Sequence, residues 1–268
     1  MVKKYEMSDI ELLHHFLSIE IYQGDDGVFI CQSKYDEKVF KKVRIFGCKP
    51  VATPLVVNEK LMKEDGGKKV DETFYRSLVG NLFYLTATRS DIMFIASLLS
   101  RFMINPNHIH FVIIKRVLRY VQCTMDYGIK YDKGNEVRLI GFCDNDWGGC
   151  ADDMKNTSGY CFSIGGGVFS WCLKKQKSVA QSSTEAEYVS ASMATSQTIW
   201  LRRITEDISE KQENAMVIHC NKKSAITMSK NLCYHRRTKK IALKHHFIRD
   251  ATEHGEYELV YCRTRAIS

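Results

Sequence analysis

Residues 182–204 read SSTEAEYVSASMATSQTIWLRRI, a stretch that predicts a long helix with a defined start. Ser182, followed three residues later by Glu185, is a capping box, in which each side chain satisfies a free backbone N–H group at the helix start. Glu187 lies about 200° around the helix from Glu185, so it belongs neither to the box nor to the same face. Capping therefore does not explain Glu187, which is free for chemistry.

The apolar residues of this helix predict the face that it buries. They recur at spacings of four, seven and four, as expected for one side of a helix that packs on a flat apolar surface. We expect a β-sheet beneath that side. The predicted buried stripe consists of Val189, Met193, Trp200 and Ile204.

Strand patterns surround this helix in residues 136–268. The predicted order is βββ-α-β-α-α-β, which is typical of an α/β domain with a mixed sheet covered by helices. Asp144 closes the first of these strands, and a glycine turn at 165–167 joins the second to the third. The strands are expected at 137–143, 158–164, 168–172, 216–220 and 257–261, and the two later helices at 224–230 and 241–254.

Residues 1–132 predict a mainly helical α+β region behind a β-hairpin. Strands at 18–23 and 28–32 are joined by the turn Gly24-Asp25-Asp26-Gly27. This turn imitates the metal-binding acidic turn of some polymerases, but such a site needs a further aspartate on an earlier strand. A solvated turn is the better interpretation. Helices are expected at 8–16, 34–43, 72–103 and 108–122.

Composition and charge indicate a globular protein in a reducing compartment. The chain has 268 residues, 44% of them hydrophobic, and a formal net charge of +8 that suggests an anionic partner. No secretory leader opens it and no apolar run is long enough to cross a membrane, so we expect a cytoplasmic or nuclear protein without a membrane partner. The ten cysteines form no C-x-x-C pair, which favours reduced thiols over a zinc site.

Basic residues gather in two places of the C-terminal half, where they predict contacts with phosphates. A solvated basic face without a ligand is the alternative, because surface lysines are common. Lys174, Lys175 and Lys177 stand just before the helix at 182–204. The second group lies in residues 222–249, which hold no Asp or Glu, and includes Lys222, Lys223, Arg236, Arg237, Lys239 and Lys240.

A tetrapeptide in the N-terminal half, Arg116-Val117-Leu118-Arg119, matches the R-x-L-R pattern of secreted pathogen effectors. In those proteins the pattern follows a cleaved leader, which we do not find here. Basic residues that flank apolar ones are ordinary on an amphipathic helix. The match keeps an effector function open only as a weak alternative.

Long motifs in both halves resemble the Pol polyprotein of copia-type (Ty1/copia) LTR retrotransposons. The resemblance implies that residues 1–132 are the thumb and connecting region at the end of a reverse transcriptase, without its catalytic palm. It implies that residues 136–268 are a ribonuclease H-like domain, which cuts RNA in RNA–DNA hybrids. The motifs include YRSLVGNLFYLTATRSDIMF at 75–94, DNDWGG at 144–149, TSGYCFSIGGGVFSW at 157–171 and KKQKSVAQSSTEAEY at 174–188.

The active site of that family consists of four carboxylates that hold two Mg²⁺ (or Mn²⁺) ions. The resemblance assigns the first carboxylate to Asp144 and the helix glutamate to Glu187. Asn221 stands where the family has its third, an aspartate, and the chain ends at Ser268, before the helix that carries the fourth. Two carboxylates should hold divalent ions weakly if at all, because an amide supplies only a dipole.

We therefore predict a ribonuclease H-type chain that is weak or inactive, with no reverse transcriptase activity on its own. The expected partners are RNA–DNA hybrid or another nucleic acid, and the rest of a Pol polyprotein. A nucleic-acid-binding module without catalysis is the main alternative. The simpler interpretations of Asp144 and Glu187 are a strand-end turn residue and an exposed helix acid.

Overall fold

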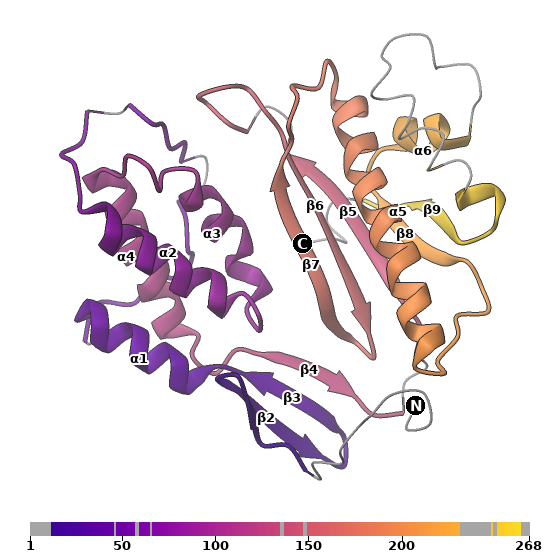
Figure 1. The fold of residues 1–268 in the computed structure, drawn as a ribbon, viewed down its shortest axis with the longest axis horizontal. Helices are drawn as coiled ribbons and strands as arrows, with labels where there is room; N and C mark the ends of the chain where they lie inside the picture. The colour runs from indigo at the N-terminus through magenta and orange to yellow at the C-terminus, as the bar shows by residue number, and fades with distance from the viewer. Residues whose placement is uncertain are drawn as a thin grey trace. The chain divides into compact units, whose positions relative to one another are not determined.

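Two units make up the part of the chain that the computed structural model describes, namely residues 12–45, 47–56, 59–64, 66–134, 137–146, 149–230, 248 and 251–263. The N-terminal unit contains the described residues of Ile10–Lys133, together with Cys150–Asp153. The C-terminal unit contains the described residues of Gly134–Gly149 and Met154–Ser268. Figure 1 draws both units, and its colour bar gives the residue numbers.

An antiparallel sheet of the order β1-β2-β3-β4 forms one layer of the N-terminal unit. The predicted hairpin is confirmed as β2 (Ile19–Gly24) and β3 (Gly27–Cys31). The sequence did not predict β4 (Ile129–Asp132), which pairs with β3 from far along the chain. His15–Phe16 forms the short strand β1, where the sequence predicted the end of a helix; residues 12–16 are not helical, so the prediction is wrong there, and residues 8–11 lie outside the described residues.

The acidic turn of the hairpin contacts β4. The Asp26 carboxylate forms an ion pair with Lys130, with 2.8 Å between its Oδ2 atom and the lysine Nζ atom. The side chain of Asp26 is 76% exposed. This agrees with the interpretation of a solvated turn.

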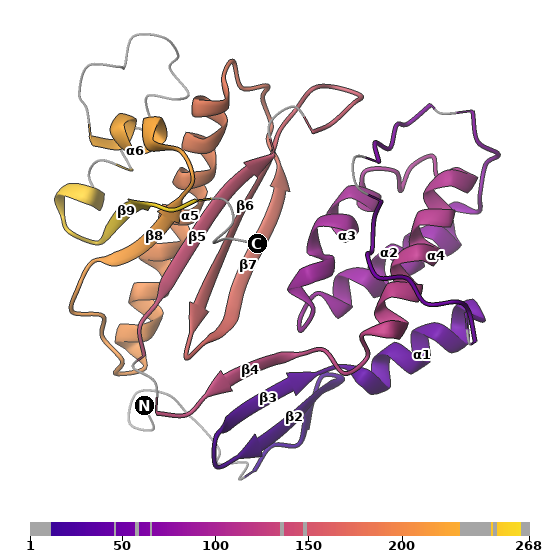
Figure 2. The ribbon, with the colours of Figure 1, turned by 180° about the vertical axis from the view of Figure 1, so that it is seen from behind.

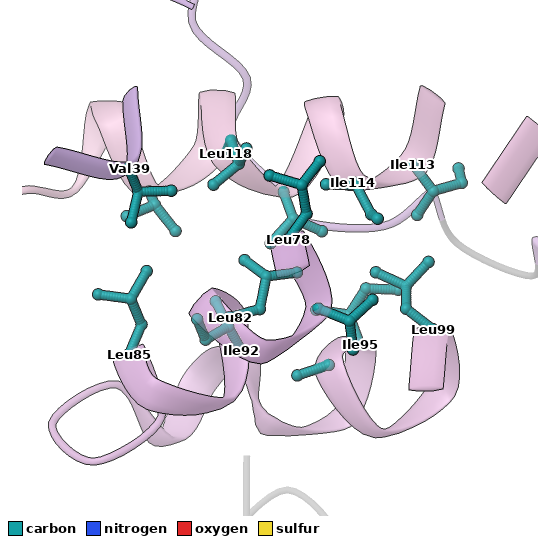
Figure 3. Close-up of a cluster of buried hydrophobic side chains, with 14 of the residues drawn as sticks. Val39, Leu78, Leu82, Leu85, Ile92, Ile95, Leu99, Ile113, Ile114 and Leu118 are labelled. Atoms are coloured by element: carbon teal, nitrogen blue, oxygen red, sulfur yellow. The ribbon is translucent and has the colours of Figure 1, made fainter. Parts of the chain in front are cut away.

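Helices α1 (Ser33–Val43), α2 (Glu72–Leu85), α3 (Met93–Ser100) and α4 (His108–Cys123) complete the N-terminal unit. The single helical segment predicted at 72–103 is wrong, because the chain turns after α2 and the short 3₁₀ helix η1 (Ser90–Ile92) leads into α3. The helices bury the apolar core drawn in Figure 3. Its labelled side chains are Val39, Leu78, Leu82, Leu85, Ile92, Ile95, Leu99, Ile113, Ile114 and Leu118.

Five strands form the mixed sheet of the C-terminal unit, in the order β7-β6-β5-β8-β9. The predicted antiparallel meander is confirmed as β5 (Ile140–Asp146), β6 (Thr157–Ile164) and β7 (Gly167–Lys175). β8 (Met216–Cys220) and β9 (Tyr257–Tyr261) add to it in parallel.

Helix α5 (Ser183–Asp207) runs along one face of this sheet, as Figures 1 and 2 show from opposite sides. The shorter α6 (Lys223–Lys230) follows β8. The helix predicted at 241–254 falls largely outside the described residues, although residues 251–253 are helical.

The buried side of α5 differs from the predicted stripe. Trp200 is 54% exposed, and Val189, Met193 and Ile204 are only partly buried. Small side chains face the sheet instead, which allows a close approach of the helix, and the prediction failed because it followed large apolar residues. The side chains buried at regular helical spacing are Glu187, Ala191, Ala194, Thr198, Leu201 and Thr205.

The start of α5 is capped nearly as predicted. The Ser182 hydroxyl oxygen accepts a hydrogen bond of 3.1 Å from the Glu185 backbone N–H group. The Glu185 carboxylate, however, accepts a 2.9 Å bond from the N–H group of Gln181 rather than from that of Ser182. The cap thus fixes the first turn of the helix that carries Glu187.

Candidate active site

The parallel pairing of β5 and β8 creates the core of the candidate site. Cys143 on β5 is in register with Cys220 on β8, so the next residues, Asp144 and Asn221, are neighbours at the same edge of the sheet. The Asn221 amide Nδ2 donates a 2.9 Å hydrogen bond to Asp144 Oδ1. A carboxylate only accepts hydrogen bonds when it is ionised, which fixes the orientation of the amide.

Glu187 on α5 completes the cluster. Glu187 is only 2% exposed, so the interpretation of this residue as an exposed helix acid is wrong. Burial, the largest cause, raises the pKa of Glu187 together with the nearby negative charges of Cys220 and Asp144 and a hydrogen bond to Asp144, so that the pKa moves from 4.5 to about 8. The raised pKa favours the protonated form of Glu187 beside Asp144.

Ser190, which the sequence analysis did not single out, ties α5 to the two strands beneath. Its hydroxyl lies 2.6 Å from the backbone carbonyl of Asp144 and 2.9 Å from that of Gly159. It follows Glu187 by three residues, a helical spacing that would have placed it on the same face. Ser190 is therefore a positioning residue for Asp144.

Gln176 is a second polar residue that the sequence did not indicate. Its amide Nε2 lies 2.7 Å from the Ser158 hydroxyl, 3.1 Å from the Ala186 carbonyl oxygen and 3.4 Å from Asn145 Oδ1. These contacts connect the end of β7 with the residue before Glu187 and the residue after Asp144. The side chain is 93% buried, since only 7% of it is exposed.

Two cysteine thiols lie directly under the carboxyl groups. A hydrogen bond from Cys143 lowers the pKa of Cys220 to about 7, whereas the same contact and burial raise the pKa of Cys143. Cys262 follows β9 and its backbone N–H group donates a 3.0 Å bond to the Cys220 carbonyl. The edge of the sheet therefore holds soft thiol groups near the hard carboxylates.

This set of donors does not fit a pair of divalent metal ions. In the part of the chain that the structure describes, no three His, Cys, Asp or Glu side chains gather where they could hold a metal ion. The Asn221 amide directs an N–H group, not a lone pair, at Asp144. Hard divalent cations need anionic or carbonyl oxygen ligands, so a positive N–H dipole in this place opposes them.

The predicted basic residues before α5 lie on strand β7 and in the loop after it. Lys174 and Lys177 are exposed, and Lys175 is half-buried. Lys174 and Lys175 are consecutive on β7, so their side chains leave opposite faces of the sheet. Only one of these two can therefore face a ligand on a given side.

The second predicted basic group begins at the candidate site itself. Lys222 follows Asn221, and its positive charge acts to lower the pKa of Glu187, against the larger effects of burial and neighbouring negative charge. The Lys223 ammonium lies 4.9 Å from the centre of the Tyr261 ring. The remaining members, Arg236, Arg237, Lys239 and Lys240, lie outside the described residues.

The R-x-L-R tetrapeptide lies inside α4. Val117 is fully buried and Leu118 is 1% exposed, because both belong to the core of the N-terminal unit. Arg116 donates a 3.0 Å bond from Nη2 to the Thr53 hydroxyl. The two middle residues of the tetrapeptide, Val117 and Leu118, are therefore core residues of the N-terminal unit.

No helix among the described residues is long and apolar enough to cross a membrane. No protein-family model matches the chain. A solved foamy viral protease-reverse transcriptase is similar in fold, with a TM-score of 0.51 and 12% identity over 93% of this chain and 44% of that one. The mixed five-stranded sheet of the C-terminal unit, with α5 and α6 beside it, agrees with the predicted α/β fold class.

Two of the relatives that are similar in sequence are a secreted effector and a transposon polyprotein. The secreted RxLR effector protein 161 of Plasmopara viticola is 43% identical over 128 residues, which are 47% of this chain and 90% of that protein. The retrovirus-related Pol polyprotein from transposon RE2 of Arabidopsis thaliana is 37% identical over 262 residues, or 98% of this chain. This chain spans only 18% of that polyprotein. With this match over nearly its whole length, the chain belongs to the copia-type retrotransposon Pol polyprotein family.

Proposed function

We propose that the C-terminal unit binds RNA–DNA hybrid as a ribonuclease H-like domain and that its hydrolysis of the RNA strand is weak or absent. The observation that carries the proposal is the Asn221 amide, which donates its hydrogen bond to Asp144 in the middle of the cluster. Two-metal hydrolysis requires ions that activate the water and stabilise the leaving oxygen. With an amide at this position, Asp144 and Glu187 alone would have to hold Mg²⁺ or Mn²⁺.

Binding requires less of the site than catalysis does. Exposed cationic side chains that neutralise phosphates supply most of the sequence-independent affinity for nucleic acids. Lys174, Lys177 and Lys222 are placed near the ends of β7 and β8, where a hybrid backbone would run over the sheet edge. The similar foamy viral structure was solved in complex with dsDNA, which supports a nucleic-acid partner in this fold.

The N-terminal unit is proposed to be the end of a reverse transcriptase, with its thumb and connecting region and without the catalytic palm. In this proposal the chain performs no DNA synthesis on its own and works beside the rest of a Pol polyprotein, in the cytoplasm or nucleus. The hairpin turn supports the absence of the palm's metal site from this unit, since the Asp26 carboxylate forms an ion pair with Lys130.

A binding and cleavage assay on one preparation tests the proposed function. We expect the full chain to bind an end-labelled RNA–DNA hybrid with an affinity that falls steeply with salt, and to release no RNA fragments in Mg²⁺ or Mn²⁺. Lys222→Ala should weaken binding, whereas Lys211→Ala should not, because Lys211 lies in the loop between α5 and β8 next to Glu213. Efficient cleavage by the unmodified chain, with many turnovers per molecule, that Glu187→Ala abolishes would refute the predicted weak or absent activity.

An effector function is the second candidate, and the match to 90% of the Plasmopara viticola protein is what favours it. A short linear motif must be accessible to the protein that recognises it. Val117 and Leu118 are packed in the core, so recognition would require α4 to unfold. We therefore expect trypsin to leave the bonds after Arg116 and Arg119 intact in the native chain. Cleavage at either bond under native conditions, detected by mass spectrometry, would favour the effector function.

A further inference from the structure

We propose that the C-terminal unit binds nucleic acid without a divalent ion, because the Asn221 amide takes the place at Asp144 that a cation would need. The inference rests on the proposed function and specifies how it operates. It concerns the chain's own side chains and is separate from the question of residual hydrolysis.

Geometry at the sheet edge supplies the first argument. The Asn221 side chain donates to Asp144 Oδ1 over 2.9 Å, and Asn221 Oδ1 is buried without a hydrogen-bond partner. Turning the amide around would bring two oxygen atoms together, so Asp144 favours the present orientation. A cation that binds Asp144 Oδ1 in this direction would first have to break this bond.

Local charge supplies the second argument. A cluster of several carboxylates repels the phosphates of a nucleic acid until metal ions neutralise it. Here the amide replaces one negative charge, and Lys222 brings a positive charge directly after Asn221. Because one negative charge fewer lies beside Asp144 and Lys222 lies next to it in the chain, a phosphate meets less repulsion there with no ion present.

Fluorescence anisotropy of a labelled RNA–DNA hybrid measures the affinity of the chain with and without a divalent ion. The affinity of the unmodified chain is expected to change by less than about twofold between EDTA and Mg²⁺ at matched ionic strength. Asn221→Asp should bind about fivefold or more weakly in EDTA, since it adds a negative charge beside Asp144, and should recover in Mg²⁺. Asn214→Asp is the matched control, because it makes the same change at an exposed position before β8. It should behave like the unmodified chain.

Metal-dependent stability gives a second readout. Mg²⁺ or Mn²⁺ should raise the Tm of Asn221→Asp and leave that of the unmodified chain unchanged, because only a bound ion stabilises the folded state. If Asn221→Asp does not fold, calorimetric titration of the unmodified chain with Mn²⁺ decides, and the expected result is no binding heat.

The outcomes separate the two proposals. Hybrid binding by the unmodified chain that appears only with Mg²⁺, or a Tm rise of that chain with either ion, overturns the present inference and leaves the proposed function standing. Failure to bind hybrid in both EDTA and Mg²⁺ removes the proposed function itself.

Discussion

Replacing Glu187 with glutamine is expected to stabilise the C-terminal unit, and the gain should grow as the pH rises. The pKa of Glu187 is raised from 4.5 to about 8 in the folded chain, chiefly by burial. Between these two values the unfolded chain releases this proton while the folded chain keeps it. The folded state then binds more protons than the unfolded state, so the free energy of unfolding falls as the pH rises through this window.

Glutamine removes this pH dependence because it never ionises. Its amide can also donate to Asp144, as the protonated carboxyl does. Linkage sets an upper limit of roughly 4–5 kcal/mol on the gain above about pH 8, and we expect about half of it, because water entry and relaxation weaken the effect of burial.

Urea unfolding followed by tryptophan fluorescence at about pH 5, 7 and 9 measures this effect. All three tryptophans of the chain, at positions 147, 171 and 200, follow residue 134, so the signal reports on the C-terminal half. Glu206→Gln is the matched control, since Glu206 is exposed on the same helix. Equal stability of Glu187→Gln and the unmodified chain at every pH would contradict the predicted burial of this carboxyl.

The second large effect is expected from Asp36→Asn in the N-terminal unit. Asp36 lies on α1, is 3% exposed, and has an Oδ1 atom without a hydrogen-bond partner. Burial raises the pKa of Asp36 from 3.8 to about 7, and the positive charge of Arg89 opposes this only in part. Asp91 and Glu20 add negative charge nearby and raise the same pKa.

The sign is the same as for Glu187, because the folded chain again holds the proton more tightly. Stability of the N-terminal unit should fall between about pH 4 and pH 7 and then level off, with an upper limit of roughly 4 kcal/mol. Asp36→Asn should abolish the fall, while Glu37→Gln, at the exposed neighbouring residue, should preserve it. Hydrogen exchange of peptides that cover α1 reports on this unit. Protection factors of α1, corrected for the faster intrinsic exchange at higher pH, that are equal at pH 5 and pH 8 in the unmodified chain would refute the prediction.

Local patterns in the sequence predicted much of the C-terminal unit. Alternation of apolar residues located the meander β5–β7, and the serine cap located the start of α5, because both signals depend on neighbours in the chain. The assignment of Asp144 and Glu187 to one site came from the resemblance to the family, and Asp144, predicted to close its strand, lies inside β5, which continues to Asp146. The sequence also marked Asn221 as the departure from the family pattern.

Features that depend on distant contacts were not predictable. The buried face of α5 is set by how closely small residues such as Ala191 and Ala194 approach the sheet, so the large Trp200 is left outside. Strand β4 was missed because its partner β3 lies far away in sequence. Asp36 had the appearance of an ordinary charged residue on an amphipathic helix, and only the packing of α1 buries it.

The parallel register of β5 and β8 sets the positions of residues 144 and 221 independently of the chemical groups that their side chains carry. Backbone pairing of Cys143 with Cys220 keeps positions 144 and 221 adjacent whatever side chains they carry. A lineage can therefore exchange aspartate and asparagine at position 221 without refolding the domain, and reversion at that position requires a single residue. A substitution at position 221 is therefore expected to change the charge beside Asp144 while the strand pairing that places the two positions together stays.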